Sequence, residues 1–369
     1  MSIKSIKILN VMAFQSQWRK NNEDCKEFDV KKGDILSKAF ALKFCDGINI
    51  LIGENGVGKT TILKMIYAAT QWSIPKKDAG KTQRLTQFFS NNLSDVDLLK
   101  NKSEAGYSYF EVSDGTHKFT DSLSHKAILE FDDWFGLNIP SVFIPTMEML
   151  SHSQGFLALN QKYKLPFDGT QVDIIVNASL PETRELPDYM NAILDKISEV
   201  IDGTILMEND TFYVLKKDGR KIDFSLEAEG LRKLGLLWKL IRNGLLESGT
   251  VLLWDEPEAN LNPELFPIVV DILLELEKAG VQIFIATHSY NLAKWFEIRR
   301  TSEEQVQYHN LYKHSSEVAK EYLLPEYSLL QETGIFGKSA FYLSELKGNK
   351  IVDADDRLLD EALKKNLGD

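Results

Sequence analysis

The chain has 369 residues, of which 43% are hydrophobic and 26% charged, and its formal net charge is −11. Its length and composition are typical of a globular protein with one large α/β domain carrying insertions, or with two modest domains. The acidic balance argues against nonspecific coating of nucleic acid, and the two cysteines without CxxC spacing argue against structural zinc. No apolar run is long enough to span a membrane, and the N-terminus lacks a signal-peptide core, so we expect a cytoplasmic protein without a membrane segment.

Along the chain, short apolar runs alternate with amphipathic stretches. The patterns predict strands at residues 5–12, 40–43, 48–52, 107–112, 117–120, 141–144, 204–207, 211–215, 221–224, 251–254, 281–286, 305–312 and 318–323. They predict helices at residues 61–70, 186–201, 227–245 and 262–278. Continuous apolar strands such as INILI and VLLW are typical of a parallel sheet covered on both faces. We therefore expect an α/β fold with an open, mostly parallel sheet and helices on both sides.

The segment GENGVGKT, residues 53–60, fits the pattern GxxxxGK[ST] without a mismatch. An apolar strand precedes it and a predicted helix follows it, which is the context that a phosphate-binding loop needs. Glycines let backbone N–H groups turn toward a phosphate, and the helix N-terminus adds partial positive charge. Lys59 would reach the β- and γ-phosphates of ATP, and the Thr60 hydroxyl would bind Mg²⁺. The candidate nucleotide-binding residues here are Gly53, Glu54, Asn55, Gly56, Val57, Gly58, Lys59, Thr60 and Thr61.

A second motif, VLLWDEP, places two carboxylates at the end of a buried strand. Asp255 would hold Mg²⁺ through water, and Glu256 would orient and deprotonate the water that attacks the γ-phosphate. A third strand, in IFIATHS, ends at His288, which could donate a hydrogen bond to the γ-phosphate and hold the water. These residues predict an ATPase that uses ATP and Mg²⁺, with Glu256 and His288 as the catalytic side chains.

Three segments in this order, GENGVGKTT, WDEPEANLNP and ATHS, resemble the Walker A motif, the Walker B motif with its D-loop, and the switch histidine of ABC-type ATPases. The resemblance is to the SMC, RecF and OLD-like branch rather than to transporter subunits. VFIPTMEMLS, AEGLRKLGLL and WDEPEANLNP further resemble AAA-annotated bacterial ATPases of Septu-type anti-phage, retron and toxin–antitoxin systems. The family implies a P-loop ABC-type head with a mostly parallel central sheet, an N-terminal antiparallel β part and an inserted smaller lobe.

The resemblance also gives a role to AEG, residues 228–230. In ABC-type heads a signature motif opens a long helix and contacts the ATP of a partner subunit, in a head-to-tail dimer. Ala228 stands where the family has a serine, so Ser225, Arg232 or Lys233 would have to supply that contact, and an ordinary amphipathic helix is the alternative. The D-loop residue Asn260 would lie at the same interface. The residues assigned to this contact are Ala228, Glu229, Gly230 and Asn260.

Two family contacts have no clear counterpart in the sequence. No glutamine follows the strand at 141–144, where the family places the Q-loop, so Thr146 or Glu148 would make that metal or water contact, and we favour Glu148. Phe14, Trp18 and Arg19 lie in the region where SMC-like heads touch the adenine, and the sequence does not choose among them.

The predicted organisation is one ABC-type ATPase head over residues 1–300 with an extension at 301–369 that completes the head or docks a partner. The head's core would comprise residues 1–71, 141–150 and 220–300, with an inserted lobe at about 72–140 and a helical and β insert at about 151–219.

The resemblance implies an ATP-driven switch in bacterial anti-phage defence. The chain would form a homodimer or a higher homo-oligomer. It shows no nuclease constellation of its own, so it would control a separate effector, a toxin or an HNH nuclease, and nucleic acid could bind through that complex. One alternative is an SMC- or RecF-like repair ATPase without coiled-coil arms, because the region between the Walker A motif and AEG lacks heptads. A transporter subunit would need LSGGQ and a Q-loop glutamine, and the sequence has neither. A scaffold that binds ATP but hardly hydrolyses it would not need Glu256 and His288, so their presence argues against that alternative.

Overall fold

The computed structural model describes residues 1–14, 39–75, 85–89, 99, 108–122, 130–132, 134–301 and 303–311. Its centre is a five-stranded sheet of order β13-β3-β12-β11-β7, in which every pairing is parallel. The predicted α/β class and parallel central sheet are therefore confirmed. The strands are β3 (Ile48–Gly53), β7 (Ser141–Ile144), β11 (Val251–Asp255), β12 (Gln282–Thr287) and β13 (Val306–Leu311).

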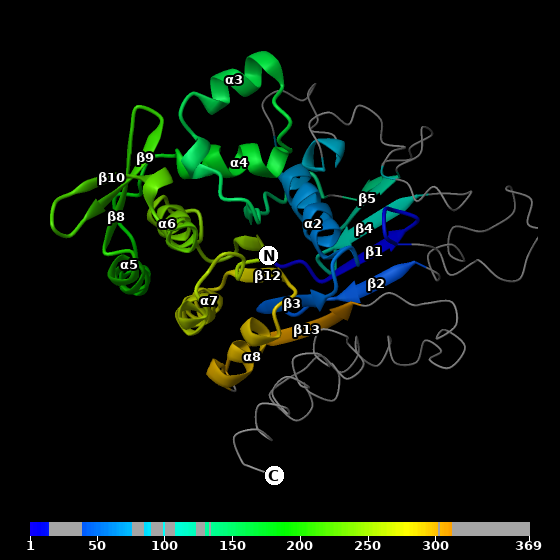
Figure 1. Cartoon of the computed structure of the whole chain (residues 1–369). Helices are drawn as coiled ribbons and strands as arrows, with labels where there is room; N and C mark the ends of the chain where they lie inside the picture. The colour runs from blue at the N-terminus through cyan, green and yellow to red at the C-terminus, as the bar shows by residue number, and fades with distance from the viewer. Residues whose placement is uncertain are drawn as a thin grey trace, which may run out of the picture.

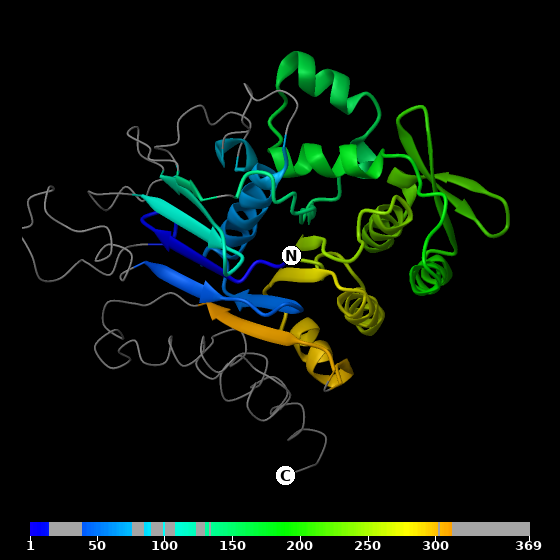
Figure 2. The same ribbon diagram turned by 180° about the vertical axis from the view of Figure 1, so that it is seen from behind.

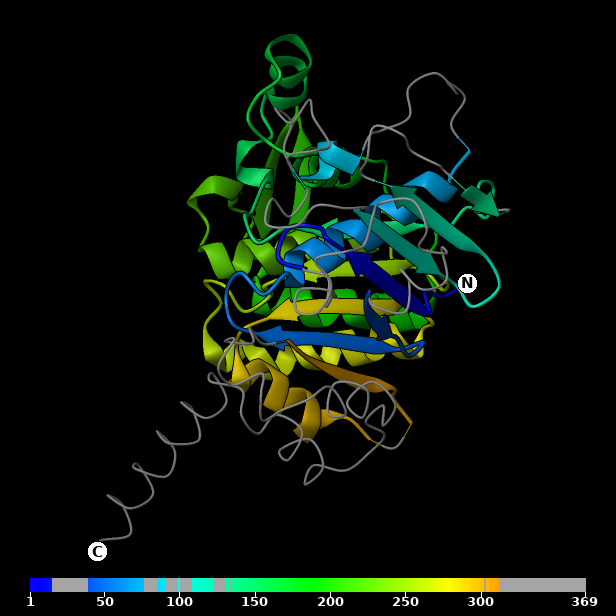
Figure 3. The same cartoon turned by 90° about the vertical axis from the view of Figure 1, so that its right-hand side faces the viewer.

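The central strands are apolar without interruption because both faces of the sheet are covered. In β11, Val251 and Leu253 pack with helix α2 (Lys59–Ser73), whereas Leu252 and Trp254 belong to the core on the other face. Figure 3 shows α2 on one side of the stacked strands and α7 on the other. The helices of that second face are α6 (Glu229–Arg242), α7 (Phe266–Lys278) and α8 (Tyr290–Arg299).

A second sheet, antiparallel throughout and of order β2-β1-β4-β5-β6, shares a core with α2. Its predicted SDGT hairpin is present, with Gly115 at φ 97° in the turn. The first strand is shorter than predicted, because Asn10 and Met12 take positive φ values of 51° and 48° and turn the chain after Leu9. The strands are β1 (Ser5–Leu9), β2 (Phe40–Lys43), β4 (Tyr109–Ser113), β5 (Lys118–Ser122) and β6 (Glu130–Asp132).

The segment between β7 and β11 adds a lobe on the opposite side of the molecule from the antiparallel sheet (Figures 1 and 2). It contains a three-stranded antiparallel sheet of order β10-β9-β8 together with helices. The lobe is joined to α6 by contacts such as the hydrogen bond from Trp238 Nε1 to Ser198 Oγ, at 2.9 Å. Its elements are α3 (Phe156–Tyr163), α4 (Gly169–Ala178), α5 (Asp188–Val200), β8 (Gly203–Glu208), β9 (Thr211–Lys216) and β10 (Lys221–Asp223).

Short 3-10 helices complete the described part of the chain. They are η1 (Leu85–Phe88), η3 (Leu150–His152), η4 (Phe224–Leu226) and η5 (Pro263–Leu265). Residues 306–311 add β13 as an edge strand beside β3, whereas the strand predicted at 318–323 and the rest of the extension lie outside the described residues. None of the helices that the structure describes is both long and apolar enough to cross a membrane.

A buried carboxylate just before β13 leads to a prediction about pH. Burial alone would raise the pKa of Glu304, but hydrogen bonds from Lys278 and Thr301 override it and hold this pKa at about 2, below its ordinary value of 4.5. The Lys278 Nζ lies 2.6 Å from Glu304 Oε1, and the Glu304 side chain is 2% exposed. Because the folded-state pKa is lowered, the stabilisation is present above about pH 4.5 and is lost as pH falls toward 2.

We therefore expect Glu304→Gln to lower the free energy of unfolding at pH 7 by roughly 2–3 kcal/mol. The expected loss does not exceed the free energy that the pKa shift alone would give, because Lys278 is half exposed and water screens the pair. Urea unfolding of both proteins across pH 7 to 2 checks this, and the two free energies should converge at the acid end. Glu303→Gln, at the exposed neighbouring position, is the control. A difference that stays constant with pH would contradict the ion-pair account.

Candidate active site

The phosphate-loop segment connects β3, which ends at Gly53, to α2, which begins at Lys59. Gly58 has a φ of 104°, and a Cβ there would lie 2.5 Å from Phe14 Cζ, so the loop requires glycine at this position. Phe14, one of the adenine candidates, is 6% exposed and packs beneath the loop with its ring centroid 4.7 Å from that of Phe40. The sequence did not choose among the adenine candidates; the structure gives Phe14 this packing role, and Trp18 and Arg19 lie outside the described residues.

The other loop residues take different positions around this turn. Asn55 and Gly56 are exposed, and Val57 is buried. Thr61 is 7% exposed and donates its hydroxyl to Met12 Sδ at 3.6 Å, which directs it away from the open side of the loop. Gly56 has a φ of 77°, in the left-handed region that glycine adopts without strain.

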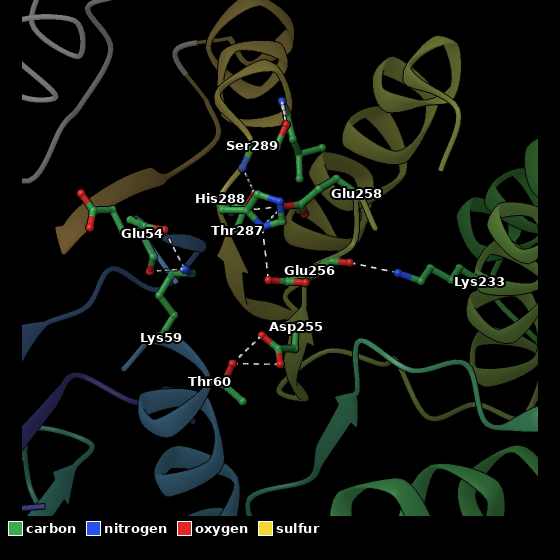
Figure 4. A network of polar contacts seen from close by, with 12 residues as sticks. Glu54, Lys59, Thr60, Lys233, Asp255, Glu256, Glu258, Thr287, His288 and Ser289 are labelled. Carbon is green, nitrogen blue, oxygen red and sulfur yellow. Dashed lines mark hydrogen bonds and ion pairs between the residues drawn. The ribbon is translucent and has the colours of Figure 1, made fainter. Parts of the chain in front are cut away.

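The Lys59 side chain folds back onto the start of the loop, and the residue is 6% exposed. Its Nζ donates to Gly53 O at 2.7 Å and to Glu54 O at 3.0 Å (Figure 4). Burial lowers the pKa of Lys59, against the attraction of Glu256, Asp255 and other carboxylates. A phosphate bound here would give this ammonium an adjacent opposite charge, which is the role of the lysine in phosphate loops.

Thr60 and Asp255 face each other although they are far apart in the sequence. The Thr60 Oγ1 lies 3.0 Å from each carboxylate oxygen of Asp255, which ends β11. Burial raises the pKa of Asp255, while hydrogen bonds from Thr60 and Thr146 oppose that rise. A hydroxyl and a carboxylate are oxygen donors of the kind that Mg²⁺ prefers. Within the described residues no group of three or more His, Cys, Asp or Glu side chains could hold a metal ion.

Glu256 and His288 are brought together by neighbouring parallel strands, β11 and β12. Glu256 Oε1 lies 3.2 Å from His288 Nδ1, and the two side chains point toward each other in Figure 4. Glu256 has a φ of 49°, and its N–H donates to Ala286 O at 2.8 Å. A non-glycine residue in the left-handed region costs about 1–3 kcal/mol and persists where the surrounding structure holds it, often at functional sites.

Lys233 has a role that the sequence alone did not predict. The sequence offered it as a possible contact to a partner's ATP, but its side chain is buried inside the chain and its Nζ donates to the backbone oxygen of Glu256 at 3.0 Å. Burial lowers the pKa of Lys233, and the carboxylate of Glu258 opposes this most strongly. The α6 helix is thereby joined directly to the turn that carries Glu256.

Glu148, predicted to make a metal or water contact, makes its contacts within the chain. Its side chain is 2% exposed, and its carboxylate accepts hydrogen bonds from the backbone N–H groups of Leu150 and Ser151 and lies 3.1 Å from Arg232 Nη1. Thr146, the other candidate, is the residue that hydrogen-bonds Asp255. Arg232 is held by its ion pair with Glu148.

The AEG segment packs against the D-loop of the same chain. Ala228 is the exposed N-cap of α6, and Asn260 Nδ2 donates to Glu229 Oε1 at 2.8 Å. A Cβ on Gly230 would lie 2.8 Å from Asn260 O and 3.1 Å from Leu261 Cα, so glycine allows the close approach of two backbones. Ser225 does not reach this helix start, because its hydroxyl donates to Asp223 at 2.6 Å.

This packing predicts that Gly230→Ala lowers the free energy of unfolding by about 1–3 kcal/mol, because a methyl group would force the D-loop backbone to shift. Gly235→Ala, in the same helix, is the matched control, since its nearest neighbours are side-chain atoms of Ile205 and Phe224. Both changes gain helix propensity, so urea unfolding should show a larger loss for Gly230→Ala than for Gly235→Ala. Equal effects would mean that the backbone contact does not restrict position 230.

Two family models match the chain. The one described as "AAA domain, putative AbiEii toxin, Type IV TA system" matches residues 141–294, and one described as an AAA domain matches residues 5–180. These matches make the chain similar to P-loop ATPases with an AAA domain. The matches include the phosphate loop and the strand ends that carry Asp255, Glu256 and His288, so the chain has an ATP-binding P-loop domain.

Curated relatives match shorter segments of this chain. The arginine transport ATP-binding protein ArtP of Haemophilus influenzae is 44% identical over 54 residues, which are 15% of this chain and 22% of that protein. The L-cystine import ATP-binding protein TcyN of Bacillus subtilis is 26% identical over 154 residues, 36% of this chain and 58% of that protein. The chain therefore matches less than two thirds of the length of either relative. Among solved structures, the SMC head domain from Thermotoga maritima matches 85% of this chain and 96% of its own, with 14% identity and a TM-score of 0.45.

Proposed function

We propose that this chain binds ATP with Mg²⁺ and hydrolyses it, with Glu256 as the general base. The observation that carries the proposal is the convergence of five side chains at the carboxyl-terminal edge of the parallel sheet. Ligands bind at this edge in open α/β sheets. The five are Lys59, Thr60, Asp255, Glu256 and His288.

Each of these side chains has a distinct task in the proposed reaction. Lys59 and the loop N–H groups bind the phosphates, and Thr60 with Asp255 would hold Mg²⁺, which neutralises charge on the β- and γ-phosphates when bound. Water attacks the γ-phosphorus, its proton passes to Glu256, and the bond to the ADP oxygen breaks. His288, beside Glu256, orients that water and the γ-phosphate.

We further propose that ATP is bound between two chains, head to tail, in a homodimer that could extend to a higher homo-oligomer. The N-terminus of α6 supports this, because Ala228 is exposed there and helix N–H groups favour an anion. The Asn260–Glu229 hydrogen bond keeps the D-loop and AEG together as one surface. The same surface would then contact the partner's nucleotide.

The dimer would control a separate toxin or nuclease in bacterial anti-phage defence. The toxin–antitoxin description of the family model that matches residues 141–294 supports an effector partner. Phage plating on cells that carry the chain with its neighbouring genes tests this role, and Glu256→Gln should remove protection. Protection that survives this change would contradict control by ATP. Tight binding of DNA by the purified chain alone would favour a repair ATPase instead.

Light scattering of Glu256→Gln protein with and without Mg·ATP tests the dimer. We expect the mass to double with Mg·ATP, because ATP stays bound when it is not hydrolysed. Adding Ala228→Glu should abolish the doubling, since a carboxylate at the start of α6 would repel the partner's γ-phosphate. Ala228→Ser is the matched control and should retain it. Bound ATP with an unchanged mass would contradict the sandwich dimer.

A further inference from the structure

We propose that Glu258 is the positioning residue for His288, a proposal that rests on the function proposed above for that histidine. Glu258 follows β11 in the same turn as Glu256, and its side chain is 6% exposed. Its negative charge also acts on the buried ammonium groups of Lys59 and Lys233. Its side-chain hydrogen bonds go to the end of β12 and to the N–H of His288, which lies between β12 and α8.

Glu258 holds the backbone on both sides of the histidine. Its Oε1 accepts hydrogen bonds from Thr287 Oγ1 at 2.6 Å and from the His288 N–H at 3.1 Å. The same Thr287 oxygen accepts from the Ser289 N–H at 2.9 Å, and the Ser289 hydroxyl caps α8 by accepting from Leu292 N–H at 3.2 Å. One carboxylate oxygen thus determines where the chain leaves β12 and where α8 begins (Figure 4).

One edge of the imidazole ring faces two carboxylates as a result. His288 Nδ1 lies 3.2 Å from Glu256 Oε1 and 3.6 Å from Glu258 Oε1. This arrangement turns the Nδ1 edge of the ring toward the turn after β11, so that the Nε2 edge faces away from both carboxylates. The His288 side chain is 44% exposed, which leaves it accessible to water and to a bound phosphate.

The second oxygen of Glu258 shows that the side chain is not there for the stability of the core alone. Oε2 is buried and makes no hydrogen bond within the described part of the chain. An unpaired buried carboxylate oxygen costs stability, and such costs are retained at sites where position matters. A glutamine would keep the Oε1 hydrogen bonds, which gives a conservative variant for the test.

The experiment compares Glu258→Ala, Glu258→Gln and the exposed control Glu264→Ala, each also combined with His288→Ala. Steady-state ATP hydrolysis gives kcat and KM, and hydrogen exchange of the nucleotide-free proteins reports on the amides of residues 288 and 289. We expect Glu258→Ala to lower kcat about 10- to 100-fold while KM changes less than about threefold. Glu258→Gln should retain most of the wild-type kcat. In the His288→Ala background, Glu258→Ala should lower kcat by less than about a further threefold.

Hydrogen exchange separates this proposal from the ATPase proposal, because it needs no nucleotide. Amides 288 and 289 should exchange faster in Glu258→Ala and remain protected in Glu258→Gln, even if the wild-type chain proves unable to hydrolyse ATP. Three results would overturn the proposal. They are unchanged exchange in Glu258→Ala, an equally poor kcat for the Gln variant, and a full additional loss of kcat in the His288→Ala background. The last two would mean that the Glu258 charge acts on the reaction independently of His288.

Discussion

Replacing Glu256 with glutamine is expected to lower kcat for ATP hydrolysis about 1,000-fold and to leave the affinity for ATP within about threefold of wild type. The amide keeps the shape of the side chain, but it cannot take a proton from water. The phosphates would still be held by Lys59 and the loop N–H groups, which this change leaves in place. Phosphate release measures kcat, and fluorescence of a labelled ATP analogue measures the affinity.

The control for this result is Glu264→Gln, an exposed glutamate in the same β11–α7 connection. It should hydrolyse ATP like the wild type. The His288 contact of 3.2 Å predicts a further result, that His288→Ala lowers kcat less than Glu256→Gln does, because a partner of the base is lost rather than the base itself. Substantial hydrolysis by Glu256→Gln would mean that the proton acceptor is another group.

The Lys59→Ala change is expected to weaken ATP binding by about 100-fold or more. Lys59 is 6% exposed, and a charge-assisted hydrogen bond in such a water-poor place contributes about 1.5–3 kcal/mol. More than one phosphate oxygen would lose this hydrogen-bond partner, so the losses of binding free energy add up. Calorimetric titration with Mg·ATP at pH 7 measures the change.

Lys196→Ala is the matched control for this loss of a lysine, because Lys196 lies on α5 with a side chain 46% exposed. It should bind ATP with wild-type affinity. Thermal unfolding without nucleotide should show that Lys59→Ala is folded, since its Nζ contacts only replace interactions with water. Wild-type ATP affinity in Lys59→Ala would contradict the phosphate-binding role of the loop.

Much of the fold follows from local sequence pattern. The strands at 48–53, 251–255 and 282–287 were predictable because strands buried on both faces must be apolar throughout. The phosphate loop was predictable because its glycines, lysine and threonine are adjacent in the chain. Helix α4 was missed, although its capping box of Asp168 and Gln171 is a sequence signal.

The roles of Glu148, Lys233 and Glu258 could not be predicted in the same way. Each depends on a contact between segments distant in the sequence, such as that of Glu148 with Arg232 or that of Glu258 with Thr287. A lone lysine in an amphipathic helix is usually predicted to lie on the surface. Lys233 instead points inward and donates to the backbone oxygen of Glu256. Only the packing of α6 against the turn after β11 shows its role.

Phosphate release by the wild-type chain, measured over a wide range of protein concentration at saturating Mg·ATP, tests the central claim most directly. If ATP is hydrolysed between two chains, the activity per molecule should rise with protein concentration and then level off as the dimer saturates. Glu256→Gln should remain about 1,000-fold less active at every concentration. A constant activity per molecule down to the lowest concentration would contradict the composite site, and no phosphate release would contradict the ATPase itself.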